Sequence, residues 1–464
     1  MKLMKGMFGT LVGVALATSN LWSLDTKNFK WDGSLDLNSL KTSNEADFNN
    51  KANDARARTA LRVSLGVGGQ LADDVSVRIN TVRVPAGVTA GQFGAVGAAA
   101  SASGNTTVTQ EQGLWEIQNA YVDVRDLVWG VNAKVGRQNA DYGLVGYAGL
   151  YNNDALTATA VDAINLDRKF GWLSANLFLA KPNEAVANGV ADGGAGDQNI
   201  NILSLSGNVK DVVGSAPSIP VTVNYYHATD QNAATPTDND NLGIYEVKAG
   251  LGLMDDAVSL GLDWASNTGQ LNTGATTKTK YSGTLTALSA GYTHKETGCG
   301  VSLEYALASG DDSVADTSDK SWRDLASIVP AALPAKHYGE ILGGGNLGAA
   351  GSVTQGLGSA VGVQGGGLKV LDLNVRYNPN IMDNKVGLTL DYVTAESDKQ
   401  AAALTTSKKI GSEIDLAATY KKSGDVWFTL GYATFTPQSN STVLANGLLK
   451  DSVTRLFAKA GLRF

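Results

Sequence analysis

The residues best suited to chemistry in this 464-residue chain are charged side chains that alternate with apolar ones. Within residues 56–68, for example, Arg58 and Arg62 alternate with Leu61 and Leu65. Successive side chains of a strand point to opposite faces, so such a segment has one charged face and one apolar face. Guanidinium groups on the charged face can bind a carboxylate or phosphate through two parallel hydrogen bonds. The pattern therefore predicts rows of charged side chains along which polar solutes can bind and move.

The alternation places basic residues mainly on the early strands and at the end of the chain, and acidic residues on the later strands. The expected basic set is Arg56, Arg58, Arg62, Arg78, Arg83, Lys134, Arg137, Arg376, Arg455 and Lys459. The expected acidic set is Asp263, Glu304, Asp372, Asp391, Glu413 and Asp415. Facing walls of opposite charge would create a transverse field that orients polar solutes. In the alternative interpretation, these charged side chains form ion pairs with their neighbours and only keep the interior of the barrel hydrated. A bulge is expected near Arg83, where the phase is unsettled.

Catalytic chemistry is not indicated by the rest of the sequence. A nucleophile, a base and an orienting group must lie close together in an active site. The three histidines, His227, His294 and His337, are expected at an outer strand end, at the opposite end and in a long loop. No metal-binding motif of the His-Glu-x-x-His, Cys-x-x-Cys or calcium-loop type occurs. We expect no enzyme activity, no cofactor and no metal.

The elements that must position these charges are strands. About eighteen segments alternate with period two, each near the 9–11 residues that a tilted strand needs to cross a membrane. Tight polar turns and longer connections follow one another in strict alternation along the chain. This predicts an all-β, antiparallel, up-and-down transmembrane barrel of about 18 strands, with short periplasmic turns and long extracellular loops. The longest loops are 85–113 and 310–366, and the latter either folds into the lumen as a constriction or forms a surface lid.

The two ends of the chain indicate where the barrel resides. Lys2 and Lys5 precede a short apolar run that ends at Ala17, which predicts a signal peptide over residues 1–17 and a barrel over 18–464. The last segment is apolar on one face and ends on Phe464, as is typical of the closing strand of an outer-membrane barrel. We expect the bacterial outer membrane, with its lipid and lipopolysaccharide as surroundings and the barrel-assembly machinery binding at Phe464.

Three stretches resemble a known family. They are Gly136-Arg137-Gln138 with Tyr142-Gly143, the segment 410–416 leading to 431–435, and 334–339 in the long loop. They are similar to the alginate-export type of bacterial outer-membrane porins. The resemblance implies an 18-stranded channel and an acidic polysaccharide as one cargo. Residues 151–164 keep an Asp-Ala pair but lack the arginine-containing segment that precedes this pair in that family.

Together these features predict a passive channel for small hydrophilic, anionic solutes. One alternative is an export channel for an acidic, alginate-like polysaccharide. Another is a structural or adhesive barrel with a plugged pore. The net charge of −7 argues against a nucleic-acid partner. Assembly into a homo-oligomer is left open.

Overall fold

The computed structural model of this chain describes most of the region expected to form the barrel. The described residues are 29–44, 56–84, 114–139, 160–183, 198–231, 239–272, 278–312, 317–325, 338–342, 366–379, 381–383, 385–399, 408–438 and 451–464. The expected signal peptide, the expected loop 85–113 and parts of 310–366 lie outside them.

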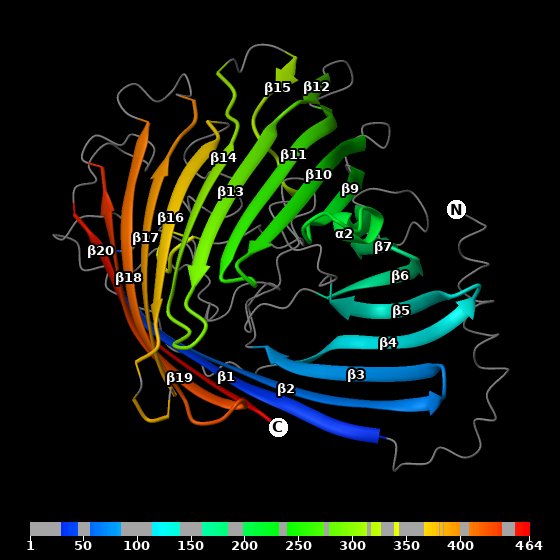
Figure 1. Ribbon diagram of the computed structural model, residues 1–464, viewed down its shortest axis with the longest axis horizontal. Helices are drawn as coiled ribbons and strands as arrows, with labels where there is room; N and C mark the ends of the chain where they lie inside the picture. The colour runs from blue at the N-terminus through cyan, green and yellow to red at the C-terminus, as the bar shows by residue number, and fades with distance from the viewer. Residues whose placement is uncertain are drawn as a thin grey trace.

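The described strands form one closed antiparallel wall (Figure 1). The sheet has twenty strands, of which β12 (Lys278–Tyr281) and β15 (Ser318–Asp319) are short additions at one end. The other eighteen confirm the predicted fold class. They are β1 (Phe29–Ser43), β2 (Arg56–Ala72), β3 (Val75–Val84), β4 (Leu114–Val128), β5 (Val131–Asn139), β6 (Ala160–Phe170), β7 (Leu173–Asn183), β8 (Gln198–Asn208), β9 (Pro220–Gln231), β10 (Asn239–Leu253), β11 (Val258–Asn272), β13 (Thr284–Thr293), β14 (Gly300–Ala308), β16 (Leu368–Tyr377), β17 (Val386–Glu396), β18 (Lys409–Lys421), β19 (Val426–Pro437) and β20 (Val453–Arg463).

Closure of the sheet joins the first strand to the last. Leu37 of β1 pairs with Leu61 of β2 on one side and with Ala460 of β20 on the other. Phe464 continues this ladder, because its N–H donates to the Gly33 carbonyl and its carbonyl accepts from the Gly33 N–H. A closed barrel satisfies its backbone groups between strands and leaves no open edge, which a membrane wall requires.

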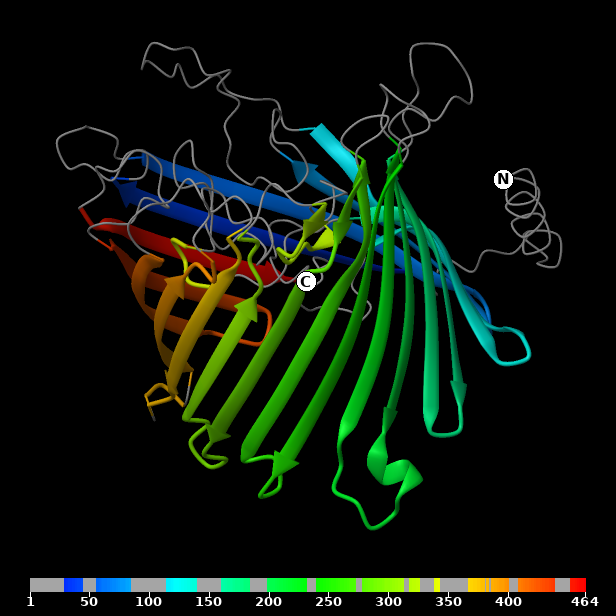
Figure 2. The ribbon, with the colours of Figure 1, turned by 90° about the horizontal axis from the view of Figure 1, so that it is seen from above.

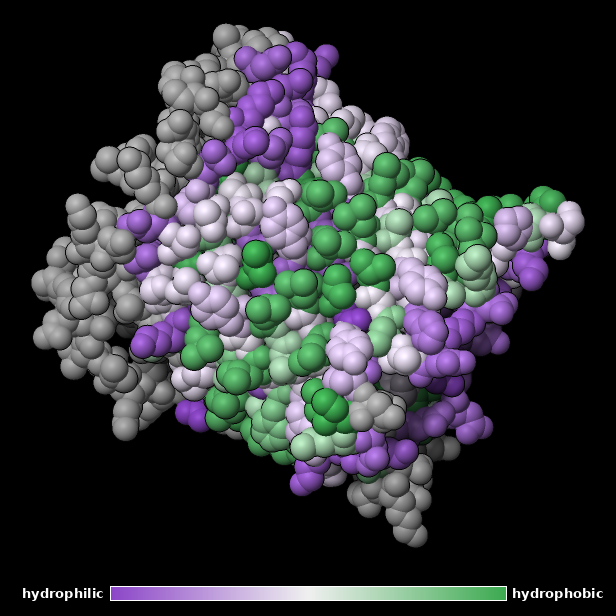
Figure 3. All heavy atoms as spheres, turned by 60° about the vertical axis from the view of Figure 1, so that its left-hand side comes forward, coloured by the Kyte–Doolittle hydropathy of each residue, from purple (hydrophilic) through white to green (hydrophobic). Residues whose placement is uncertain are grey.

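The outward face of the wall is apolar, as the alternation predicts. Leu61, Leu65, Leu262, Leu390 and Leu416 are among its exposed side chains. In the view of Figure 3 such side chains gather over the middle of the wall, between more polar ends. Exposed apolar side chains of this extent suit hydrocarbon better than water.

Aromatic side chains mark the end of the wall where the short turns lie. Trp31, Trp129, Trp172, Tyr377 and Phe464 are all exposed there. Amphipathic aromatic rings of this kind favour the boundary between lipid and water. These side chains therefore form part of an aromatic girdle at this end of the barrel.

Short turns join the strands at one end of the barrel (Figure 2). Residues 129–130 connect β4 to β5, and residues 254–257 connect β10 to β11. The connection between β8 and β9 carries α2 (Val209–Val212), which is capped by the Asn208 side chain. No described helix has the length and apolarity to span a membrane.

The interior departs from expectation on one side of the barrel. Ile202 of β8, Leu242 of β10 and Ile244 of β10 point inward and are fully buried. They belong to one buried apolar cluster together with Trp322 and Leu342 of the connection between β14 and β16. Apolar side chains therefore occupy both faces of these strands, since the inner face packs against inserted chain rather than water.

Candidate pore constriction

A short segment of the long connection, residues 338–342, lies against the inner wall of the barrel. Its Tyr338 hydroxyl donates to Glu304 of β14 at 2.5 Å. Tyr338, Ile341 and Leu342 are almost fully buried. Of the two alternatives for residues 310–366, the constriction is therefore the one that this described segment supports. We call residues 338–342 the lumen segment.

Carboxylates of the inner wall hold the lumen segment through its backbone. The N–H of Glu340 donates to Asp415 at 2.9 Å. The next two N–H groups, those of Ile341 and Leu342, donate to the two oxygens of Glu413 at 2.6 and 2.8 Å. A hydrogen bond contributes about 0.5–1.5 kcal/mol net, so these three bonds together hold the lumen segment in one position.

Five of the six acidic residues in the predicted set belong to β14, β16, β17 and β18, on the inner face of this part of the wall. The strand register sets Glu304 opposite Asp372 and Asp391 opposite Asp415. Glu413 and Asp415 are buried, whereas Asp391 accepts a short hydrogen bond from Asn374. We call the inward carboxylates of β14 to β18 the acidic wall; its members are Glu304, Asp372, Asp391, Glu413 and Asp415.

Two cationic side chains of β20 contact Glu340 of the lumen segment. Lys459 forms an ion pair with the Glu340 carboxylate at 2.5 Å. Arg455, which is only 2% exposed, donates to the Glu340 carbonyl and, at 3.0 Å, to the Thr42 hydroxyl. The lumen segment thus spans from the acidic wall to the basic residues of β20.

Further inward cations continue along the early strands, and several have partners. Arg78 forms a bidentate ion pair with Asp32, at 2.7 and 2.8 Å. Arg62 is buried and donates to Gln118 at 2.7 Å, while Lys134 lies over the Tyr121 ring at 5.0 Å. Arg463, which follows Arg455 and Lys459 on the same face of β20, pairs with Asp36 at 2.7 Å. The pairing interpretation therefore accounts for part of the basic set. We call the inward cations Arg62, Arg78, Lys134, Arg455, Lys459 and Arg463 the basic wall.

Two predicted lining residues lie on the opposite face. Arg83 is exposed and lies on the same face of β3 as Ile79, which points outward. The extra residue that breaks the register between β3 and β4 lies in β4, so the alternation along β3 is unbroken. Arg137 is also exposed and pairs at 3.8 Å with Asp162, one residue before inward Ala163. Both corrections have one cause. Near strand ends the outward face meets water again, so a charge there no longer marks the lumen.

The remaining predicted lining residues are placed as follows. Arg376 has the inward phase of Asp372 and Asn374 on β16 and is exposed. The backbone at Arg56 and Arg58 pairs with Thr42 and Leu40. The side chains of these two arginines lie outside the described residues.

Asp263 belongs to a buried polar network that sequence reasoning finds only in part. Lys248 of β10 lies 3.6 Å from Asp263 and 3.4 Å from Glu246. Glu246 is fully buried and accepts from Asn224 and from the Tyr226 hydroxyl, both at 2.7 Å. The signal that could have found it is the Glu-x-Lys spacing on β10, which sets both charges on the inner face of one strand.

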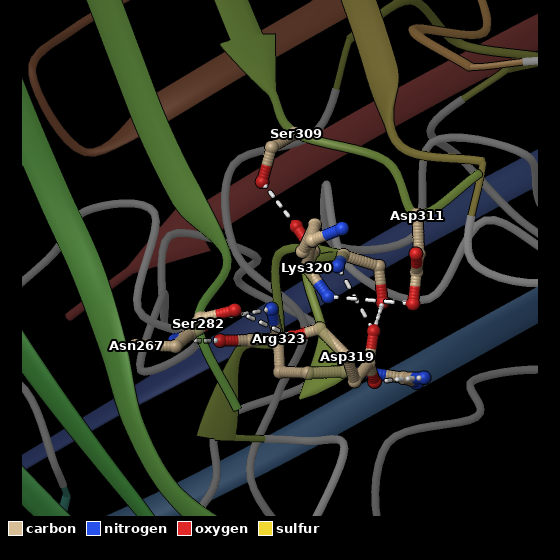
Figure 4. A network of polar contacts seen from close by, with 8 residues as sticks. Asn267, Ser282, Ser309, Asp311, Asp319, Lys320 and Arg323 are labelled. Atoms are coloured by element: carbon tan, nitrogen blue, oxygen red, sulfur yellow. Dashed lines mark hydrogen bonds and ion pairs between the residues drawn. The ribbon is translucent and has the colours of Figure 1, made fainter. Parts of the chain in front are cut away.

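A second described piece of the long connection, residues 317–325, is anchored near the outer ends of β11 and β13 (Figure 4). Asn267 of β11 exchanges two hydrogen bonds with the backbone of Arg323, at 2.7 and 2.9 Å. Asp319 pairs with the Arg323 guanidinium at 2.8 Å, and Ser309 donates to the Lys320 carbonyl at 2.6 Å. Burial raises the pKa of the nearby Tyr281 phenol, which keeps it neutral. This anchorage fixes the start of the long connection.

The two histidines within the described residues lie far apart in the topology. His227 lies near the outer end of β9, with its ring stacked on Tyr225, and His294 lies in the short turn between β13 and β14. His337 falls outside the described part of the chain. Within that part, no group of three or more His, Cys, Asp or Glu is arranged to hold a metal ion.

Comparison with known proteins identifies the fold through solved structures. No protein family model matches the sequence, and no curated protein matches it. The outer membrane protein OprD from Pseudomonas aeruginosa is similar over 94% of this chain and 94% of its own, with a TM-score of 0.55 and 11% identity. OccAB4 from Acinetobacter baumannii is similar over 94% and 98%, with a TM-score of 0.56 and 13% identity. These structures support the barrel fold, whereas the finer resemblance to the alginate-export type remains a prediction.

Proposed function

We propose that this chain is an outer-membrane porin, a passive diffusion channel for small hydrophilic and preferentially anionic solutes. The observation that carries the proposal is the lumen segment, which lies inside a closed barrel between an acidic and a basic wall. A barrel with an apolar exterior and a charged interior suits lipid outside and water inside. The similarity to the outer membrane protein OprD supports the same setting.

Planar-bilayer recording of the purified, refolded protein tests this proposal. We expect stepwise ion conductance without any energy source. A protein that inserts and conducts nothing would instead favour a structural or adhesive barrel with a plugged pore. Blockade of the current by an alginate-like polymer, but not by a neutral polymer of equal size, would favour export of an acidic polysaccharide.

The basic wall supports the preference for anions. We expect Arg62→Ala to lower chloride conductance relative to potassium conductance, because it removes a cation from the inner face of β2. The measurement is the reversal potential under a potassium chloride gradient. An unchanged reversal potential would count against a role for Arg62, and Arg83→Ala, on the outward face, is the control expected to change nothing.

Phe464 supports the predicted interaction with the barrel-assembly machinery. This residue is 63% exposed at the short-turn end, while its backbone is paired with Gly33. We expect Phe464→Ala to reduce the amount of protein assembled in the outer membrane without changing the conductance of the molecules that do assemble. Cell fractionation with heat-modifiability on gels measures the first quantity. Normal assembly of the variant would contradict this role.

A further inference from the structure

Glu340 is the residue of the lumen segment whose side chain reaches the basic wall. Its carboxylate lies 2.5 Å from the Lys459 ammonium, and its carbonyl accepts from Arg455. Its N–H points the other way, toward Asp415. One residue of the long connection therefore touches both charged walls, with the neutral inner face of β19 between them.

The ion pair between Glu340 and Lys459 borders open space. About 30% of each side chain is exposed, unlike Arg455 and Glu413 beside them, which are buried. The Lys459 ammonium also lies 4.9 Å from the centre of the Phe457 ring, which limits the directions it can take. Solutes that enter the lumen therefore meet this pair, and its net charge is zero while Glu340 is in place.

We infer that Glu340 is a selectivity-determining residue of the pore: its carboxylate neutralises Lys459 and thereby restrains anion passage. The inference rests on the proposed porin function. Without Glu340 the basic wall would present one more free cation beside the lumen segment. With Glu340 but without Lys459, the same place would present a carboxylate next to the acidic wall. A unit charge about 6 Å from a passing ion changes the local concentration of that ion about threefold in water.

The test compares reversal potentials of the full-length protein in planar bilayers under a potassium chloride gradient. We expect Glu340→Gln to raise the chloride-to-potassium permeability ratio about threefold or more. We expect Lys459→Met to lower the ratio by a similar factor, and the double variant to return near the original value. Asp162→Asn is the matched control: it removes one carboxylate from an exposed ion pair on the outward face and should leave the ratio unchanged.

The outcomes separate this inference from the function on which it rests. A wild-type protein that conducts, with all variants sharing its permeability ratio, would overturn the role of Glu340 and leave the porin proposal intact. Shifts in the same direction for both single variants would also overturn it, because they would indicate release of the lumen segment rather than a change of charge. A wild-type protein that never conducts would overturn both.

Discussion

Replacing Gly339 with valine is expected to widen the pore and raise single-channel conductance. Gly339 has a φ of +72°, a conformation that costs an L-residue about 1–2 kcal/mol and a β-branched one more. A Cβ at this position would lie 2.6 Å from the Glu413 carboxyl, which is fixed by two N–H groups of the lumen segment. The segment should therefore leave its seat, and the carboxylates it covers would be hydrated.

A glycine elsewhere in the barrel provides the control for this variant. Gly171 also has a positive φ, of +58°, but a Cβ added there would meet no atom within 4 Å, and it belongs to the short turn between β6 and β7. We expect Gly171→Val to strain that turn and to leave conductance unchanged. Equal conductance of Gly339→Val and the wild type would mean that the lumen segment does not narrow the pore.

Replacing Lys248 with methionine is expected to destabilise the barrel strongly. Lys248 is the cation between Glu246, which is fully buried, and Asp263, whose side chain is 13% exposed. Removing one partner of a buried ion pair costs about 3–5 kcal/mol, because an uncompensated charge remains. Guanidinium unfolding in lipid vesicles, followed by tryptophan fluorescence, measures the loss in free energy of unfolding.

Two further variants show whether charge is the cause. Adding Glu246→Gln and Asp263→Asn to Lys248→Met should recover most of the lost stability, since neutral amides need no counter-charge. Arg137→Met, which breaks an exposed pair on the outward face, should change the free energy of unfolding by less than about 1 kcal/mol. A Lys248→Met protein as stable as the wild type would refute the role of this network.

The sequence predicts the wall of this barrel well because lipid imposes a strict rule on it. Leu61 and Leu65 must face hydrocarbon, so Arg62 between them must face inward, and the structure places them so. The rule weakens at strand ends, where outward residues meet water. A charged side chain near a strand end is therefore a poor sign of the lumen, and the prediction that Arg83 and Arg137 line it is wrong, since each lies on the outward face.

The constriction could be predicted only in part. The acidic wall follows from the alternation of residues along the strands. The sequence of residues 338–342, by contrast, has no feature that predicts hydrogen bonds from its N–H groups to Glu413 and Asp415. That contact joins positions more than seventy residues apart in the chain. The inward apolar residues Ile202 and Ile244 were the available hint, because a water-filled lumen gives no reason for both faces of a strand to be apolar.

The close approach of Gly310 and Gly366 has a consequence for protein engineering. A Cβ at Gly310 would collide with the Gly366 carbonyl oxygen, so the long connection leaves and re-enters the wall at almost the same point. Beside these two glycines the pairing of β14 with β16 is already complete, from Ala308 with Leu368 to Gly300 with Arg376. A short turn between these two glycines would therefore keep the register of β14 and β16, while it would remove the segments that cover the inner apolar face of β8 and β10. An engineered replacement for the connection needs apolar side chains at the positions of Trp322 and Leu342.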